Sequence, residues 1–437
     1  MKRRALFVVA TLVLAVVSLS AAPTVSEKQD MAIFALGYYG WAIPQEALGN
    51  IDTEVQKVFV DLGRFNVIGM TERLSSGGLQ QFIDTLKQAK QANFVMPDKY
   101  QFGEAVLTEA EFNKLLGAFI VAVPVVTNYN SFYNNKSFRY ETQIKTDVTF
   151  IDVSAGGSTI GIAEIETQGT DKDNQAKSVA NAIDAIPMQL QFEIRKIPAF
   201  QINTRVLAVA GPEVKLQLGQ NMGIRKGDEY SVLLEGTVQG FKDEREVGLI
   251  LIKDVGTEVS TGRIIYSSVA LNPDVQLREI PRLGVDVEPY LHIISGDQGA
   301  TLPGARFVLS RGFYGFRPYV GVQIPLAQIY SFATITAIPI SGIIGGEYNL
   351  HLGRLTITPY GGAGITYLYV SEAISGVSDQ TNLFPHAGVQ GYLDLSFLVS
   401  RDVSIYVEGG ADYWLSLMNY FPSFGGPGFG AGVSIKF

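Results

Sequence analysis

The chain has 437 residues, of which 47% are hydrophobic and 17% are charged, and its formal net charge is −8. It is long enough for about three domains at the usual ~100–200 residues each. The acidic balance argues against a general basic surface for nucleic acid. The absence of cysteine excludes disulfides, cysteine-ligated metals, a cysteine nucleophile and a cysteine-linked lipid anchor.

Residues 1–22 are predicted to be a secretory signal peptide. Three basic residues at 2–4 are followed by an apolar run over 5–17, and small residues end the segment. A single membrane helix is the alternative, but it needs ~20 apolar residues. The order of basic, apolar and small residues is that of an export signal. We therefore expect export of the chain from the cytoplasm.

Residues 23–197 are predicted to form a periplasmic α/β domain, because apolar residues recur there with helical spacing in some segments and form short apolar runs in others. The expected strands are 31–40, 64–70, 117–126, 138–153 and 159–169. The expected helices are 44–62, 78–93, a short helix begun by a capping box at Thr108 and Glu111, and a helix from Asp173 to Ile194.

Three segments of this region carry a family resemblance: MAIFALGYYG (31–40), LGRFNVIGMTERL (62–74) and LLGAFIVAVPVV (115–126). They resemble the periplasmic domain of the curli-secretion channel family and the TolB-type N-terminal domain, which implies an α/β fold in the periplasm. The export function does not carry over, because the curli-type channels are lipid-anchored through a cysteine that this chain lacks. Arg64 and Phe65, in the second segment, are expected to pack a strand against a helix.

Residues 198–280 are predicted to form a small β-rich domain. Gly219, Gly223 and Gly227 stand where tight turns are expected between short strands. The pattern of Leu218–Gly219, Gly223 and Gly227–Asp228 resembles the small β module of the flagellar assembly protein T type. This segment contains no G-x-x-x-x-G-K-[ST] phosphate loop.

From residue 284 the composition changes: 284–437 contain 24 of the 46 glycines and a single lysine, Lys436. Side chains alternate with period two, one face apolar and the other small or polar, which is typical of half-buried strands. The connections alternate between short and long, as in transmembrane barrels. Eight strands are expected, at about 284–295, 304–311, 316–324, 337–350, 353–369, 384–399, 402–415 and 428–437.

This tail resembles the bacterial outer-membrane β-barrels of the small, eight-stranded OmpA type. The resemblance rests on the strand number and on the final alternating strand, which ends GAGVSIKF. It implies that Phe429 and Phe437 belong to the terminal aromatic signal read by the barrel-assembly machinery. An even number of strands also places the first and the last residue of the barrel segment on the same side of the membrane, the periplasmic side.

The polar face of these strands is predicted to line the barrel lumen. A barrel of eight strands has an interior that side chains can fill, so we expect a packed polar network of Asp286, Glu288, His292, Arg306, Arg317, Glu347, Asp394, Glu408, Asp412 and Lys436. Acids outnumber bases, which leaves a narrow cation-preferring pore as an alternative. An interfacial aromatic belt is expected from Tyr367, Tyr369, Trp414, Tyr420 and Phe421.

Together these features predict a fold of an α+β periplasmic domain (23–197), a small β domain (198–280) and a C-terminal antiparallel transmembrane β-barrel (284–437). We expect a non-enzymatic outer-membrane protein whose barrel anchors the periplasmic domains, because no catalytic motif is found. The expected partners are outer-membrane lipid, the barrel-assembly machinery, and a periplasmic protein or further copies of the chain. An adhesin or ligand-binding barrel acting through its outer loops is a further alternative. No cofactor, metal or nucleic acid is expected.

Overall fold

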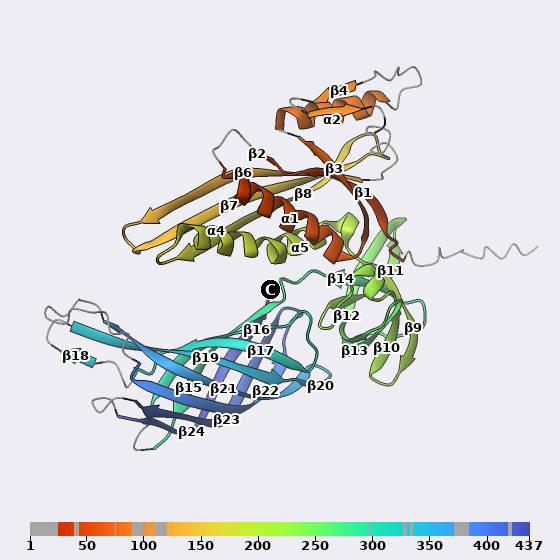
Figure 1. Cartoon of the computed structure of the whole chain (residues 1–437). Coiled ribbons are helices and arrows are strands. Elements are labelled where there is room, and N and C mark those ends of the chain that lie inside the picture. The colour runs from red at the N-terminus through yellow and green to blue at the C-terminus, as the bar shows by residue number, and fades with distance from the viewer. Residues whose placement is uncertain are drawn as a thin grey trace, which may run out of the picture.

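The computed structural model describes residues 25–38, 43–74, 76–89, 99–102, 105–108, 110, 120–296, 299–326, 330–332, 335–370, 384–417 and 422–437. The predicted signal peptide and residues 111–119, which include Glu111 of the predicted capped helix, therefore lie outside the described residues, whereas Thr108 ends a β-strand. Figure 1 shows three parts: an α/β sheet with helices, a small closed β-barrel and a larger β-barrel. Strands predominate throughout, and the helices are few.

The first part is a mixed sheet in the order β3-β1-β6-β7-β8, with β2 also paired to β6. The pairs β1–β3, β1–β6 and β2–β6 are parallel, and β6–β7 and β7–β8 are antiparallel. Its strands are β1 Gln29–Ala35, β2 Gly37–Tyr38, β3 Phe65–Arg73, β6 Ile120–Asn134, β7 Arg139–Asp152 and β8 Ser158–Asp171. Its helices are α1 Gln45–Leu62, α2 Ser76–Ala89, α4 Gln175–Asp184 and α5 Ile186–Lys196. A separate hairpin is formed by β4 Lys99–Phe102 and β5 Ala105–Thr108.

Helices cover both faces of this sheet. The apolar stripes of α1, α4 and α5 bury one face, and α2 covers the other (Figure 1). The helix predicted over 173–194 is two helices, and its first cap is Asn174, whose side chain accepts a hydrogen bond from the Lys177 amide. Pro187 lies in the first turn of α5 and has no N–H to continue the ladder of α4, so the chain breaks there.

The second part is a closed barrel in the order β10-β13-β12-β11-β14-β9. Its strands are β9 Asn203–Ala210, β10 Glu213–Gln217, β11 Glu229–Val238, β12 Phe241–Val255, β13 Val259–Ser267 and β14 Gln276–Ile280. The predicted turn glycines Gly223 and Gly227 have positive φ angles of 73° and 79°, a conformation that favours glycine. Both also touch other parts of the chain: a Cβ at Gly223 would lie 1.8 Å from the Leu62 carbonyl oxygen.

The third part is a closed antiparallel barrel of eight strands. It is closed on one side by pairing of the first and last strands, β15 with β24, and on the other by pairing of β19 with β21. Two short strands, β18 Tyr330–Phe332 and β20 Leu350–Leu352, extend its hairpins. The eight strands are β15 Val285–Ile294, β16 Thr301–Leu309, β17 Phe316–Gln323, β19 Ile335–Tyr348, β21 Leu355–Val370, β22 His386–Leu398, β23 Val403–Ser416 and β24 Phe424–Lys436.

The outer face of this barrel is apolar and exposed. Alternate residues of β23 show the pattern, since Ile405, Val407 and Tyr413 are exposed while Tyr406 and Glu408 are buried. The described residues of the eight strands alternate in this way over most of their length. The exposed apolar side chains form the lipid-facing band of a transmembrane barrel. Within the described ranges, no helix has the length and apolar character needed to cross a membrane.

Two adjacent glycines of β23 allow the packing of the barrel interior to be tested. A Cβ at Gly410 would lie 2.1 Å from the Gly391 carbonyl oxygen and 2.6 Å from the Tyr392 ring, whereas one at Gly409 would meet no described atom within 4 Å. We expect Gly410→Ala to lower the free energy of unfolding by about 1–3 kcal/mol, the usual cost of overpacking. Gly409→Ala is the matched control and should change it far less. Urea unfolding in lipid vesicles measures both, and equal effects would contradict the inward packing of Gly410.

Candidate functional site

The charged residues of the barrel interior form a connected network, and its lower part surrounds Arg317. The Arg317 guanidinium contacts the carboxylates of Asp286 and Glu347, and its Nε lies 2.8 Å from Glu347 Oε1. Glu288 lies next to this group, with Oε1 3.7 Å from Arg317 Nη2, and also accepts a hydrogen bond from the Ser434 hydroxyl. Three carboxylates therefore share one guanidinium near the short-turn end of the barrel.

Arg306 lies at the middle of the lumen and is 1% exposed. Its Nε donates to Glu288 Oε2 over 3.1 Å, and its Nη1 donates to Glu408 Oε2 over 3.3 Å. Asp394 is 3.9 Å away. The guanidinium also lies over the Tyr360 ring, 4.0 Å from its centroid, which is cation–π geometry. Arg306 thus joins the lower cluster to the upper one.

The upper cluster centres on His292, which is fully buried. Its Nε2 lies 2.7 Å from Glu408 Oε1, and its Nδ1 lies 3.3 Å from Asp412 Oδ2. The imidazole is stacked between the Tyr290 and Tyr392 rings, with both centroid distances 4.3 Å. An imidazole held between two carboxylates and two rings has little freedom to move, so this cluster fills the lumen as a rigid plug.

Strand β11 of the small barrel crosses the short-turn mouth of the large barrel. Just before β11, the Lys226 carbonyl accepts a hydrogen bond from the Gly312 amide over 2.7 Å, and Asp228 pairs with Arg311; both partners belong to the β16–β17 turn. Further along, Leu233 is paired with Glu246, whose carboxylate lies 2.6 Å from Arg401 in the β22–β23 turn.

These two turns lie on opposite sides of the mouth, because four strands separate them in either direction around the barrel. Eight strands ~4.8 Å apart and tilted ~40° enclose a circle roughly 16 Å across. The six residue-to-residue steps from Gly227 to Leu233 span about 20 Å at ~3.3 Å per step. The strand is therefore long enough to bridge the mouth.

Between those two ends, Glu229 connects the small barrel to the lumen. Its carboxylate contacts Lys436 Nζ, from the last strand of the large barrel, and Arg282, from the linker between the barrels. Burial by itself would raise the pKa of Glu229, but Lys436 and Arg282 outweigh it and hold the pKa below its usual value. An apolar contact seals the same junction, formed by Leu249, Ile265, Ile280 and Leu398.

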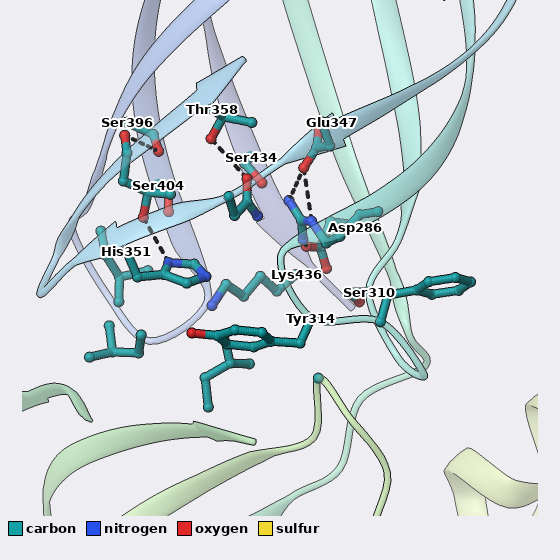
Figure 2. Close-up of a pocket in the computed structure, with 18 of the residues that line it drawn as sticks. Asp286, Ser310, Tyr314, Glu347, His351, Thr358, Ser396, Ser404, Ser434 and Lys436 are labelled. Carbon is teal, nitrogen blue, oxygen red and sulfur yellow. Dashed lines mark hydrogen bonds and ion pairs between the residues drawn. The ribbon is translucent and has the colours of Figure 1, made fainter. Parts of the chain in front are cut away.

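A small cavity of about 90 Å³ remains between the lumen network and the small barrel. Figure 2 shows the hydroxyls of Ser396, Ser404 and Ser434 on its barrel side, with Lys436 and Tyr314 between them and the small barrel. A water molecule needs ~10–15 Å³ of such a cavity, so the cavity has room for several water molecules. In the described part of the chain, no group of three or more His, Asp and Glu side chains is arranged to hold a metal ion.

The structure places all ten residues of the expected lumen network on the inner face of the barrel and connects nine of them through ion pairs with one another. Lys436 is the tenth, and its ion pair is to Glu229 of the small barrel rather than to a lumen carboxylate. Phe429 and Phe437, the residues of the implied assembly signal, are exposed on the outer face.

The aromatic belt prediction was wrong for Trp414. This side chain is 1% exposed, stacks on Phe424 inside the barrel and donates from its indole nitrogen to Asp412. Its position in β23 has the same parity as Asp412 and Glu408, so the pleat turns it inward. Tyr367 and Tyr369 are exposed on the outer face, whereas the other two belt residues, Tyr420 and Phe421, lie outside the described residues.

Sequence reasoning missed the lumen tyrosines. Their hydroxyls or rings complete the network: Tyr360 donates to Glu408 over 2.8 Å, Tyr392 donates to Asp412, and Tyr290 donates to Gln323. A signal was present for two of them, because Tyr290 shares a strand face with Glu288 and His292, and Tyr392 shares one with Asp394. Strand β21, which carries Tyr360, contains no predicted lumen residue. Residue type alone favours the lipid boundary for an aromatic side chain, whereas the pleat of the strand decides which face it occupies.

A closed antiparallel eight-stranded barrel, with an apolar outer face and a charged interior, is the architecture of a transmembrane β-barrel of the kind found in bacterial outer membranes. No family model matches the chain, and no curated protein does.

Among solved structures, the chain is similar to Neisserial surface protein A, with 14% identity, a TM-score of 0.24, and coverage of 35% of this chain and 96% of that one. It is also similar to a major outer membrane protein from Thermus thermophilus, with 10% identity, a TM-score of 0.20, and coverage of 35% and 99%. A third similar structure is the hypothetical protein CT253 from Chlamydia trachomatis, with 9% identity, a TM-score of 0.24, and coverage of 39% and 91%.

Proposed function

We propose that this chain is a non-enzymatic outer-membrane protein in which the eight-stranded barrel anchors the α/β domain and the small barrel on the periplasmic side. There they would bind a protein partner or assemble with further copies of the chain. The observation that carries the proposal is the docking of β11 across the short-turn mouth. Because short turns face the periplasm in such barrels, a domain fixed to them is held in the periplasm.

The contacts within the lumen favour this anchoring role over a pore. Acids outnumber bases in the lumen, but Arg306, Arg317 and His292 pair with most of them. The middle of the lumen is occupied by buried side chains, and β11 spans the mouth below it. The adhesin alternative depends on outer loops that lie largely outside the described residues, at 371–383 and 418–421.

Crosslinking in membranes tests the docking. The chain has no cysteine, so Glu246→Cys with Arg401→Cys introduces one pair, at a contact now 2.6 Å apart. We expect a short bismaleimide to join the pair within one chain in isolated outer membranes, because the small barrel is fixed to the β22–β23 turn. A matched control combines Arg401→Cys with Gln88→Cys on α2, on the side of the α/β sheet away from the large barrel (Figure 1), and should not crosslink.

Two results would contradict the proposal. Recovery of the protein in the soluble fraction, with no change of gel mobility on boiling, would contradict the transmembrane barrel. Absence of the crosslink in a protein that is heat-modifiable and membrane-bound would contradict the docking of the small barrel at the mouth, but not the transmembrane barrel.

A further inference from the structure

The hairpin of β11 and β12 extends past the rim of the large barrel. Glu246, which pairs with Arg401 at the rim, lies five residues from Phe241 at the hairpin tip. Five residues of antiparallel strand span about 17 Å at ~3.4 Å each. Since β11 enters from the opposite side of the mouth, continuing along its direction carries the tip outward, beyond the barrel wall.

The tip presents apolar side chains to solvent. Phe241 is 78% exposed and Val238 is 59% exposed, and the two are paired across the turn. Gln239 and Gly240 between them have φ angles of 53° and 86°, the conformation of the tight I′ turn that favours hairpins. This tight turn therefore holds a phenyl ring and an isopropyl group at the end of the hairpin without burying them.

The outer surface of the barrel shows what covers this tip. In β22 the exposed apolar face continues through Phe397 to Val399, directly before the turn that contains Arg401. Because such residues face lipid, the boundary of the bilayer lies at this turn. The β11–β12 hairpin contacts the same turn through Glu246. The tip of this hairpin therefore lies beside the lipid head groups of the periplasmic leaflet.

We propose that the tip of the β11–β12 hairpin inserts Val238 and Phe241 into the head-group region of the periplasmic leaflet. Aromatic side chains are favoured at that depth, and insertion would remove two exposed apolar side chains from water. The lipid contact would add a second membrane anchor beside the barrel and would fix the orientation of the small barrel at the mouth. This inference rests on the proposed docking of the small barrel and goes beyond it.

A single fluorescent label tests the insertion. Phe241→Cys in the full chain, folded into vesicles of phosphatidylethanolamine and phosphatidylglycerol, is labelled with a nitrobenzoxadiazole dye. We expect blue-shifted emission and loss of intensity when some lipids carry a doxyl quencher near the head group. The control is Gln88→Cys on α2, an exposed position away from the large barrel, which should keep red emission and full intensity.

An unshifted, unquenched dye at position 241, in a protein that is heat-modifiable, would overturn the insertion. Equal quenching at positions 88 and 241 would also overturn it, since that result means general adsorption of the protein to lipid. The crosslink between cysteines at positions 246 and 401 separates this failure from failure of the docking. If the crosslink forms and the dye is exposed to water, the small barrel is docked at the mouth but its hairpin tip does not contact lipid.

Discussion

Replacement of Arg306 by methionine is expected to destabilise the barrel by about 3–5 kcal/mol, the usual cost of removing one partner from a buried ion pair. Methionine keeps an apolar stem of comparable length but leaves the carboxylates of Glu288 and Glu408 buried without their guanidinium. The ring contact with Tyr360 is lost as well. Urea unfolding in lipid vesicles at neutral pH measures the change.

Two further variants identify the physical cause. Arg401→Met removes an arginine that is 39% exposed in its side chain, and an exposed pair contributes only ~0.2–1 kcal/mol. Adding Glu288→Gln and Glu408→Gln to the Arg306 variant neutralises the carboxylates left behind, so most of the stability should return. A loss for Arg306→Met no larger than that for Arg401→Met would show that the lumen charges are not mutually dependent.

The large barrel could be predicted from sequence because its information is local. Period-two alternation places Glu408 and Asp412 on one face of β23, and the same parity rule applies to every strand. The Trp414 error arose where residue type was allowed to outweigh parity. The break between α4 and α5 was also locally visible, since Pro187 stands inside the predicted helix.

The contacts between domains could not be predicted from one sequence. Glu229 meets Lys436 across 207 residues, and Arg64 meets Glu279 across 215. No periodicity or spacing links residues so far apart, and each alone has the properties of an ordinary surface charge. Arg64 was expected to pack a strand against a helix. In the structure it joins two domains, donating to Glu279 and to the Phe200 carbonyl.

Replacement of Glu279 by glutamine is expected to loosen the α/β domain from the small barrel. The Glu279 carboxylate, 2% exposed, accepts from Arg64 of the first domain over 2.9 Å and from Arg195 of α5 over 2.6 Å. Removing its charge leaves the buried Arg64 guanidinium without a carboxylate and leaves Arg195 with Asp228 as its one remaining carboxylate partner, and breaking a buried pair in this way costs about 3–5 kcal/mol. Faster proteolysis between α5 and β9 would report the loosening, and Glu193→Gln, which breaks an exposed pair with Lys196, is the matched control.

The same residue predicts a dependence on pH. Burial alone would raise the pKa of Glu279, but Arg64 and Arg195 outweigh it and hold the pKa far below its usual value. A depressed folded-state pKa means that the stabilisation is complete above the unfolded value of ~4.3 and declines as the pH falls towards the folded value. We therefore expect the temperature at which the α/β domain separates from the small barrel to fall as the pH is lowered from about 5 to about 3. This temperature should fall less steeply in Glu279→Gln. Identical slopes in the two proteins would mean that Glu279 does not carry the coupling between these domains.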